Sequence, residues 1–300
     1  MQTTALHDSS ASPLRYLHLL PTLLIFGLLT NKVPAVVAGA VFGGEWAWAP
    51  SIGLPLAWRL DGLSMLFGLI VSGAGVLVTL YSLIYMRGQR HEGRYYLYLH
   101  SFTLAMLGIV MADHLLLLFI FWELTTVFSF LLIGFNHQDS NARNNARQAL
   151  FVTGLGGLAL LLGSLLLEAA GTSTYLHTWL DGPQGLHQHA LYPLILLCML
   201  LAVYTKSAQI PFHFWLPNAM SAPTPISAFL HSATMVKAGI YLLMRLHPLL
   251  GGTALWMGVL VVVGGTTTLW GAWNAIGPTD VKRILAQTTI MGLGMLTLFM

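Results

Sequence analysis

The residues most able to do chemistry are gathered between positions 206 and 237. This stretch holds two lysines, two histidines and four prolines, although the sequence on both sides of it is strongly apolar. Charged side chains are costly inside a lipid bilayer and are usually kept there for function. Prolines interrupt helices, and interrupted helices at membrane depth build ion sites. The stretch therefore indicates a path for ions or protons.

Lys206 lies towards the end of an expected helix over residues 191–210. Burial disfavours the charged form of a lysine, so a buried lysine can gain and lose a proton near neutral pH. Pro211 has no backbone N–H and leaves the carbonyl of Ser207 without its helical partner. Such carbonyls are tolerated at membrane depth where they line a cavity. The alternative is that Lys206 reaches the membrane surface, but the polar residues that follow favour a buried site.

A polar stripe follows on the next expected helix. Its members recur every three or four residues and share one helical face: Thr224, Ser227, His231, Thr234 and Lys237. Hydroxyls alone favour a seam that joins helices, whereas histidine and lysine on the same face favour a proton relay. His213 lies in the interrupted stretch. Two histidines without further ligands are weak evidence for a metal or haem, so we expect no metal and no cofactor.

Two further charged residues are candidates for the same path. Glu123 is the one Asp, Glu, Lys or Arg between residues 114 and 135, and it lies near the centre of that run. It is either a neutral group bonded to a neighbouring helix or a proton carrier near a lysine, and the second is the default inside a membrane. Lys282 follows Asp280, which we expect to cap the last helix. Lys282 is either a terminal anchor or the far end of the path.

The composition defines the class of protein. Of the 300 residues, 56% are hydrophobic and 8% are charged, whereas an ordinary soluble domain has about 25% charged residues. A bilayer crossing needs about 20 apolar residues of helix. Runs without Asp, Glu, Lys or Arg recur at 62–86, 95–112, 148–167, 182–205, 246–279 and 284–300. We therefore expect an all-α, polytopic transmembrane helix bundle that spans the lipid bilayer.

Other classes are excluded by what the sequence lacks. No basic cluster reaches the size of a nucleic-acid-binding patch. The single cysteine, Cys198, permits no internal disulfide, and no Cys/His spacing predicts a zinc site.

The chain divides into a polar N-terminus at 1–13, expected to be disordered, a leading region at 14–60 and a transmembrane domain at 61–300. The leading region holds one long helix or two short ones, with a signal peptide as the alternative for its start. A tryptophan-rich interfacial loop or hairpin is expected at 43–60. Asp61 is expected to cap the following helix.

Arginine-containing loops predict the orientation in the membrane. The short loops at 86–94 and 136–147 carry arginines and are expected to face the cytoplasm, whereas the loop at 171–189 has no Lys or Arg and is expected outside. Beyond that point two arrangements are open. If the helices on either side of the prolines both cross the membrane, Lys282 lies inside. If they form one broken crossing, Lys282 lies outside.

Three segments resemble the antiporter-like membrane subunits that respiratory complex I shares with Mrp-type multisubunit sodium/proton antiporters. These segments are residues 206–237, 121–134 and 280–286. The resemblance covers about residues 60–300. Within it, the sequences Phe-His-Phe-Trp and Met-Val-Lys-Ala-Gly are most similar to the A-type subunit of the Mrp antiporters, in its N-terminal half.

The resemblance implies which residues carry the ion path. They are Glu123, Lys206, His213, His231, Lys237 and Lys282. Glu123 and Lys206 would hold a proton in a switchable ion pair. The histidines and Lys237 would line the route from an aqueous half-channel, and Lys282 would pass charge onward. The supporting residues would be Ser207, Pro211, Thr224, Ser227 and Thr234.

The resemblance also implies a fold. It implies one discontinuous, proline-broken helix in the first of two inverted repeats, with residues 191–246 as a single broken crossing and Lys282 outside. A second repeat does not follow within the 300 residues, and the leading region is shorter than two helices. We therefore expect a transmembrane domain that is truncated at its C-terminal end.

The expected function is that of a membrane subunit in a hetero-oligomeric antiporter that exchanges protons for Na⁺ across the cell (cytoplasmic) membrane. Its partners would be other membrane subunits of that complex, and it would be a transporter subunit without enzymatic chemistry. The first alternative is a proton-pumping subunit of complex I or of a membrane hydrogenase. The second is a fragment or scaffold that moves no ions.

Overall fold

The structure, a computed structural model, describes residues 13–89, 91–183 and 185–300. The expectation of disorder at 1–13 lies almost wholly outside the described residues. The long helices are α1 (Leu19–Val37), α2 (Gly62–Tyr85), α3 (Glu92–Met111), α4 (Leu115–Ile133), α5 (Ser140–Ala169), α6 (Tyr192–Lys206), α9 (Met235–Leu250), α10 (Ala254–Ala275) and α11 (Val281–Leu298). Shorter elements are η1 (Pro13–His18), η2 (Pro50–Ile52), η3 (Leu176–Asp181), η4 (Leu186–Gln188), η5 (Phe212–Phe214), α7 (Trp215–Asn218), η6 (Ala219–Ser221), α8 (Thr224–Ala228) and η7 (Phe229–Ala233).

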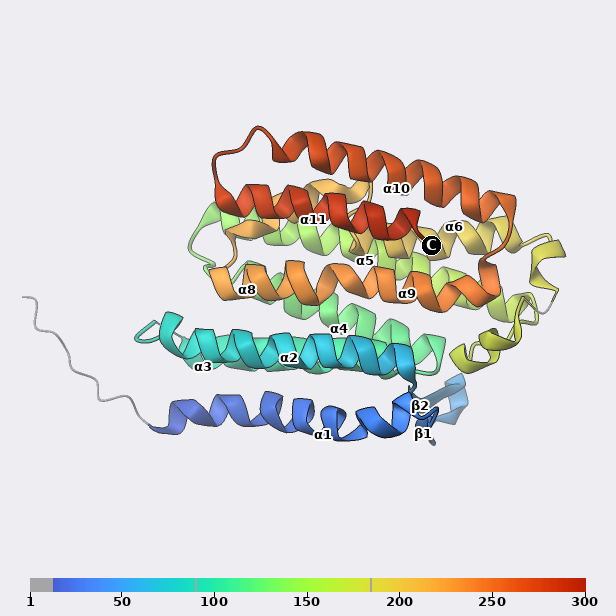
Figure 1. The fold of residues 1–300 in the computed structure, drawn as a ribbon, viewed down its shortest axis with the longest axis horizontal. Coiled ribbons are helices and arrows are strands. Elements are labelled where there is room, and N and C mark those ends of the chain that lie inside the picture. Colours follow the sequence, from blue (N-terminus) through green and yellow to red (C-terminus); the bar gives the residue numbers. More distant parts are fainter. Residues whose placement is uncertain (1–12, 90, 184) are drawn as a thin grey trace, which may run out of the picture.

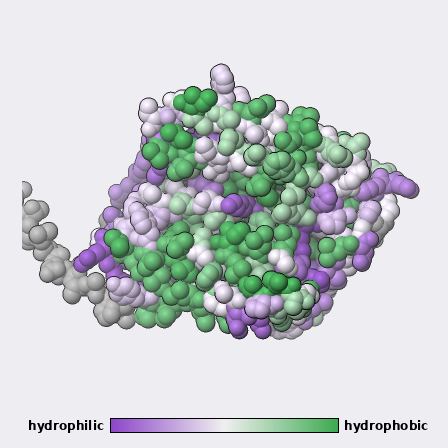
Figure 2. Space-filling view, in the orientation of Figure 1, coloured by the Kyte–Doolittle hydropathy of each residue, from purple (hydrophilic) through white to green (hydrophobic). Residues whose placement is uncertain are grey.

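The long helices lie side by side along one direction and form a bundle (Figure 1). Within the described part of the chain, six helical segments are long and apolar enough to cross a membrane, and α6 is a shorter apolar helix. Large apolar side chains such as Leu77, Phe151 and Leu269 are more than two-thirds exposed on the outside of the bundle. Apolar residues spread over the middle of the visible face and polar residues gather towards its two ends (Figure 2). The expected all-α, multi-pass membrane protein is confirmed.

The outermost helix pair shows how glycine permits close helix packing in this bundle. A Cβ atom built on Gly271 of α10 would lie 2.5 Å from the Met291 nitrogen of α11, and one on Gly294 of α11 would lie 2.6 Å from the Thr268 nitrogen of α10. These distances are too short for any side chain, so the two backbones touch directly. Small residues at such contacts are the usual means of helix association in membranes.

The leading region forms one helix followed by a β-hairpin. The strands β1 (Phe42–Ala49) and β2 (Leu54–Leu60) pair antiparallel, with Phe42 opposite Leu60. The hairpin expected at 43–60 is thus present, and Trp46 and Trp48 are exposed on it. Asp61 caps α2 as predicted, because its carboxylate accepts a hydrogen bond of 2.9 Å from the Ser64 nitrogen.

The expectation of one broken crossing over 191–246 is wrong. The α6 helix begins where α9 ends, since the Tyr192 hydroxyl donates to the Leu250 carbonyl at 2.7 Å. The α6–α7 stretch then reaches the opposite end, where Asn218 donates to Gln148, in the N-terminal third of α5, at 2.6 Å. The α8–α9 stretch returns across the bundle (Figure 1). The bundle is thus crossed twice, once by α6, α7 and η6 together and once by α8 and α9, because α6 alone does not reach the opposite end.

The second crossing places Lys282 at the same end as the arginine-containing loops. The turn between α10 and α11 lies at the end of the bundle that also holds the α2–α3 and α4–α5 turns (Figure 1). The positive-inside tendency assigns this end to the cytoplasm, and it is called the arginine-rich end below. The outside placement of Lys282 is therefore corrected to the inside one. Asp280 caps α11 as expected, by accepting from the Lys282 nitrogen at 3.0 Å.

Candidate functional site

The helix that carries Lys206 stops at that residue. After it the chain turns through residues 207–211, and Ala208 adopts a positive φ of 48°. Two contacts hold the interruption in place: the Ser207 hydroxyl donates to the Val236 carbonyl of α9 at 2.7 Å, and the Ile210 nitrogen donates to the Thr267 hydroxyl of α10 at 3.0 Å. The Ile210 N–H, which the interruption leaves without a helical partner, is thus satisfied by a neighbouring helix, as membrane interiors require.

The Lys206 ammonium is fully buried, with 0% of the residue exposed. It donates to the Trp122 carbonyl at 3.1 Å and to the Thr126 hydroxyl at 2.9 Å, both on α4. It also lies over the Trp122 ring, 5.0 Å from the centroid. All three partners are neutral, so the site can hold the ammonium without a bonded carboxylate. The alternative of a lysine that extends to the membrane surface does not apply.

Glu123 follows Trp122 directly and is half-buried at the α4–α5 contact. Its Oε1 atom is buried and has no hydrogen-bond partner in the structure. The carboxyl lies against Gly157 of α5, where any Cβ would overlap it. Glycine at this position thus makes room for the carboxyl group.

Glu123 and Lys206 are close neighbours but are not paired. Their charges interact electrostatically, yet none of the ion pairs found among the described residues joins them within 4.0 Å. The ammonium is held by the carbonyl of the residue before Glu123. The structure therefore shows the two groups apart. The carboxyl Oε1 atom accepts no hydrogen bond from a described residue, and the ammonium donates to two neutral acceptors.

The second polar group lies on α8–α9, where the expected single helical face is interrupted. A π-helical turn, η7, and the unusual backbone of Thr234 (φ −128°, ψ −88°) separate α8 from α9. His231 lies on this turn, 2% exposed, with the Ala219 backbone close to its ring, and neither ring nitrogen makes a hydrogen bond of good geometry with a described residue. Ser227 and Thr234 bond to nearby backbone carbonyls, and Thr224 is exposed at the helix start.

Lys282 connects this turn to the arginine-rich end. Its ammonium donates to the Met220 and Ala222 carbonyls at 3.3 and 3.2 Å, and its charge acts on His231. A pocket of about 570 Å³ opens at the next residue, Arg283, and its lining also includes Asn218, Asn274 and Gln287. The pocket, Lys282 and the buried His231 thus lie near one another towards the arginine-rich end.

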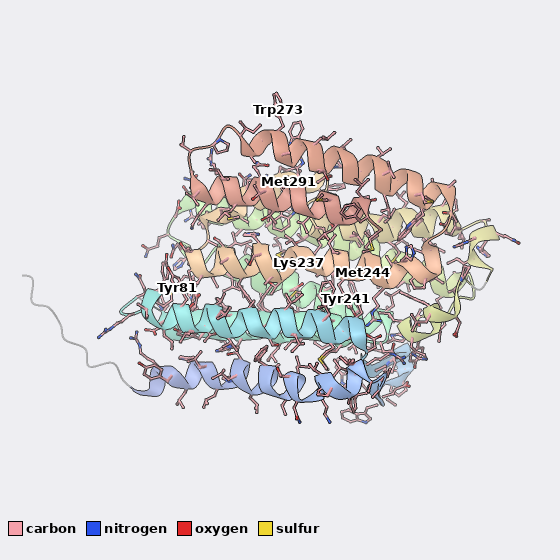
Figure 3. All side chains as sticks on the ribbon, viewed as in Figure 1. Tyr81, Lys237, Tyr241, Met244, Trp273 and Met291 are labelled. Carbon is pink, nitrogen blue, oxygen red and sulfur yellow. The ribbon has the colours of Figure 1, made fainter. Side chains whose placement is uncertain are left out.

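Two predicted residues stand apart from these contacts. His213 packs edge-on against Trp270 of α10, with ring centroids 5.4 Å apart, and its Nδ1 has no partner. Lys237 is half-buried on α9, near the middle of the bundle's length (Figure 3), and makes no hydrogen bond to a described residue. Its neighbour Val236 accepts a hydrogen bond from Ser207, beside Lys206. No group of three or more metal-ligating side chains occurs within the described ranges.

Three functional neighbours are missing from the sequence prediction. Trp122 and Thr126 hold the lysine, and Gly157 makes room for the carboxyl. The sequence does contain a signal for Trp122 and Thr126, because they lie one helical turn apart on either side of Glu123. Gly157 carries no such signal, because glycine is frequent throughout these helices.

The fold and this arrangement of intramembrane charges define a membrane protein of the transporter class. Residues 112–300 match the family model described as NADH:quinone oxidoreductase/Mrp antiporter, TM, and residues 46–96 match the one described as NADH-Ubiquinone oxidoreductase (complex I), chain 5 N-terminus. The chain belongs to this NADH:quinone oxidoreductase/Mrp antiporter family.

The individual proteins to which the chain is similar are antiporter subunits. The chain is 43% identical to the A/B subunit of a probable K(+)/H(+) antiporter of Rhizobium meliloti, over 93% of this chain and 28% of the relative. It is 44% identical to the A1 subunit of a Na(+)/H(+) antiporter of Staphylococcus haemolyticus, over 83% of this chain and 31% of that protein. A chain in the solved structure of the Mrp complex from Dietzia sp. DQ12-45-1b superposes with a TM-score of 0.83 at 37% identity, over 95% of this chain and 31% of the other. The chain thus spans about a third of the length of these relatives.

Proposed function

We propose that this chain is the N-terminal part of a membrane subunit in a monovalent cation/proton antiporter of the Mrp type. The observation that carries the proposal is the Lys206 ammonium, fully buried on neutral acceptors beside the unpaired Glu123 carboxyl. Two titratable groups that are near each other but not bonded to each other can exchange a proton by small side-chain movements. Intramembrane groups of this kind mark ion and proton pathways.

The proposed path begins at the pocket beside Lys282 and passes to His231 on the π-helical turn. It continues past the interruption after Lys206 and ends at Glu123. The polar contacts at the pocket, the lysine and the turn support the first steps. His213 and Lys237 are proposed to line the route between these groups, since each has an unpaired polar atom beside the interruption or on α9.

The setting of this activity is proposed from the relatives. We propose the cell membrane as the location, other membrane subunits of a hetero-oligomer as partners, and Na⁺ or K⁺ as the cation that moves against H⁺. The relatives named above are antiporter subunits, and the structural relative is a chain of an Mrp complex. We also propose residues 61–300 as the first of two inverted repeats, with the second beyond this chain. Transport would be driven by an ion gradient.

A second candidate is a proton-pumping subunit of a redox-driven complex. The family models that match include quinone oxidoreductases by name. The same path of charges would then be driven by electron transfer in other subunits. Co-purification of NADH- or quinone-binding subunits with the full-length protein would favour this candidate over the antiporter, and co-purification of antiporter subunits alone would exclude it.

The test is ion exchange by the full-length subunit in its complex, reconstituted in vesicles. Lys206→Ala and Glu123→Gln are expected to abolish Na⁺- or K⁺-dependent proton movement. Matched controls are Lys32→Ala and Glu168→Gln, because both side chains are exposed at the ends of their helices. Exchange that survives both substitutions at the wild-type rate would refute the proposal.

A further inference from the structure

A pocket of about 230 Å³ lies at the arginine-rich end, away from the ion path described above. It is formed by the first turns of α3, the last turn of α4 and the first turns of α5. A second pocket of about 320 Å³ adjoins it and shares Arg94, Phe135 and His137. Both lie where these helices meet the polar loop between α4 and α5, which is the level of lipid headgroups in a bilayer.

Three arginines line the first pocket: Arg94 of α3 and Arg143 and Arg147 of α5. None of the ion pairs found among the described residues includes any of them. The one carboxylate on the two linings is Asp139. It accepts a hydrogen bond from the Asn141 nitrogen at 2.9 Å and caps α5. The pocket therefore carries a net positive charge.

The arginines keep donors free for a ligand. The Arg94 Nε atom is buried without a partner, and the guanidinium lies over the Phe135 ring, 5.4 Å from the centroid. Arg143 uses one nitrogen, Nη1, to donate to the His137 and Gln138 carbonyls. Arg147 is exposed and makes no hydrogen bond to a described residue. Guanidinium groups recognise phosphate with several donors at once.

Apolar side chains share the lining of the pocket with the arginines. They include Phe130, Leu131 and Ala146. Along α5, the next outward-facing side chains after Arg147 are Phe151 and Leu155, which are 73% and 51% exposed. A cationic rim above an apolar groove matches a ligand with an anionic head and a hydrocarbon tail, and a free anion would leave the groove empty.

We propose that this pocket binds the phosphate headgroup of an anionic phospholipid, whose acyl chains lie along the exposed face of α5. Arg94, Arg143 and Arg147 bind the phosphate. Phe130, Leu131 and Phe151 contact the start of the acyl chain. Basic pockets between helices on the cytoplasmic side are known to bind such headgroups, and the charge of the pocket selects against zwitterionic lipids.

The test uses the full-length protein in its complex, delipidated in detergent and titrated with short-chain phosphatidylglycerol, short-chain phosphatidylcholine or inorganic phosphate. We expect saturable binding of phosphatidylglycerol only. Replacing each arginine by glutamine is expected to weaken that binding about fivefold, and the triple variant about a hundredfold, at about 1 kcal/mol for each arginine. Arg283→Gln is the matched control, because Arg283 lies at the same end in a different pocket.

Three results would overturn the proposal. The first is lipid binding by the triple variant that equals that of the wild type. The second is displacement of the lipid by inorganic phosphate at the same concentration, and the third is loss of a partner subunit from the triple variant while its lipid binding stays intact. The last would identify the pocket as a contact for an acidic protein segment. Arg147→Gln is the second variant if the triple variant does not assemble, because Arg147 is exposed and has no described bond to lose. Arg147→Lys is expected to retain most of the binding.

Discussion

Arg245 and Asp61 form a bidentate ion pair between the last turns of α9 and the start of α2. The Nη1–Oδ2 distance is 2.6 Å and the Nη2–Oδ1 distance is 2.7 Å. Arg245 also donates to the Tyr241 hydroxyl, which in turn donates to the Val110 carbonyl of α3. Three helices are thus joined at the end of the bundle opposite to the arginine-rich end, and this fixes the outer end of the helix that carries Lys237.

Asp61 makes the stability of this end dependent on pH. Burial by itself raises the pKa of the Asp61 carboxyl, but hydrogen bonds and the charge from Arg245, with hydrogen bonds from Ser64, lower it from 3.8 to about 2. Because the folded pKa is depressed, the stabilisation is complete above pH 3.8 and is lost as the pH falls towards 2. It amounts to about 2 kcal/mol.

Asp61→Asn is expected to destabilise the protein by about 3 kcal/mol, because it leaves the buried Arg245 charge without its partner. Thermal unfolding of the detergent-solubilised protein measures this. Asp181→Asn, an exposed site, is expected to have no effect. An unfolding temperature that is equal in the two variants would show that the ion pair contributes nothing.

Thr126→Val tests the hydrogen bond to the Lys206 ammonium. Thr125 and Thr126 are both buried and both donate to the Trp122 carbonyl, at 2.7 and 3.1 Å, but only Thr126 accepts from Lys206. A hydrogen bond to a charged group contributes about 1.5 to 3 kcal/mol, so ion exchange should fall at least tenfold in Thr126→Val. Thr125→Val should exchange at close to the wild-type rate, and equal losses in both variants would contradict the assignment.

Gly157→Ala tests the position of the Glu123 carboxyl. The added methyl group overlaps Glu123 Oε1, so the carboxyl must leave its place at the α4–α5 contact. Gly154→Ala, one turn earlier on α5, meets no atom within 4 Å and is the matched control. We expect loss of proton exchange in Gly157→Ala with normal assembly of the complex, and unchanged exchange in Gly154→Ala. Full activity of Gly157→Ala would place the working carboxyl elsewhere.

The side of the membrane on which Lys282 lies is tested by labelling. In a chain with Cys198 replaced by alanine, Asn274→Cys and His137→Cys are expected to react with an impermeant maleimide from the same side of the membrane. Asp181→Cys is expected to react from the opposite side. The prediction follows from the positions of the α10–α11 and α4–α5 turns at one end of the bundle (Figure 1). If Asn274→Cys and Asp181→Cys were labelled from the same side, residues 191–246 would form a single broken crossing after all.

Charges inside apolar runs made the principal residues predictable from the sequence. Glu123 and Lys206 each stand out because no other charged residue lies within several helical turns on their own helices. The hairpin at 43–60 and the caps at Asp61 and Asp280 were predictable for a similar reason, since turn and cap residues act locally.

What the sequence left open depends on contacts between distant segments. Whether residues 191–246 cross once or twice depends on how far α7 and η6 extend the path of α6, and that is decided by bonds to α5 and α11. The separation of Glu123 from Lys206 depends on which acceptors α4 presents to the ammonium. The aligned stripe from Thr224 to Lys237 was expected on a regular helix, whereas the structure has a π-helical turn at Phe229–Ala233 within it.

The interruption after Lys206 is hydrogen-bonded to two other helices, and this has a mechanical consequence. The Ser207 hydroxyl is tied to α9 and the Ile210 nitrogen to α10. The α10 helix is the most peripheral of the long helices in the second half of this chain, with much of its surface exposed. We expect a sideways shift of α10 to be transmitted through the Thr267–Ile210 hydrogen bond to the backbone four residues after the buried ammonium. Contact of another protein with the exposed face of α10 would then change the surroundings of that charge.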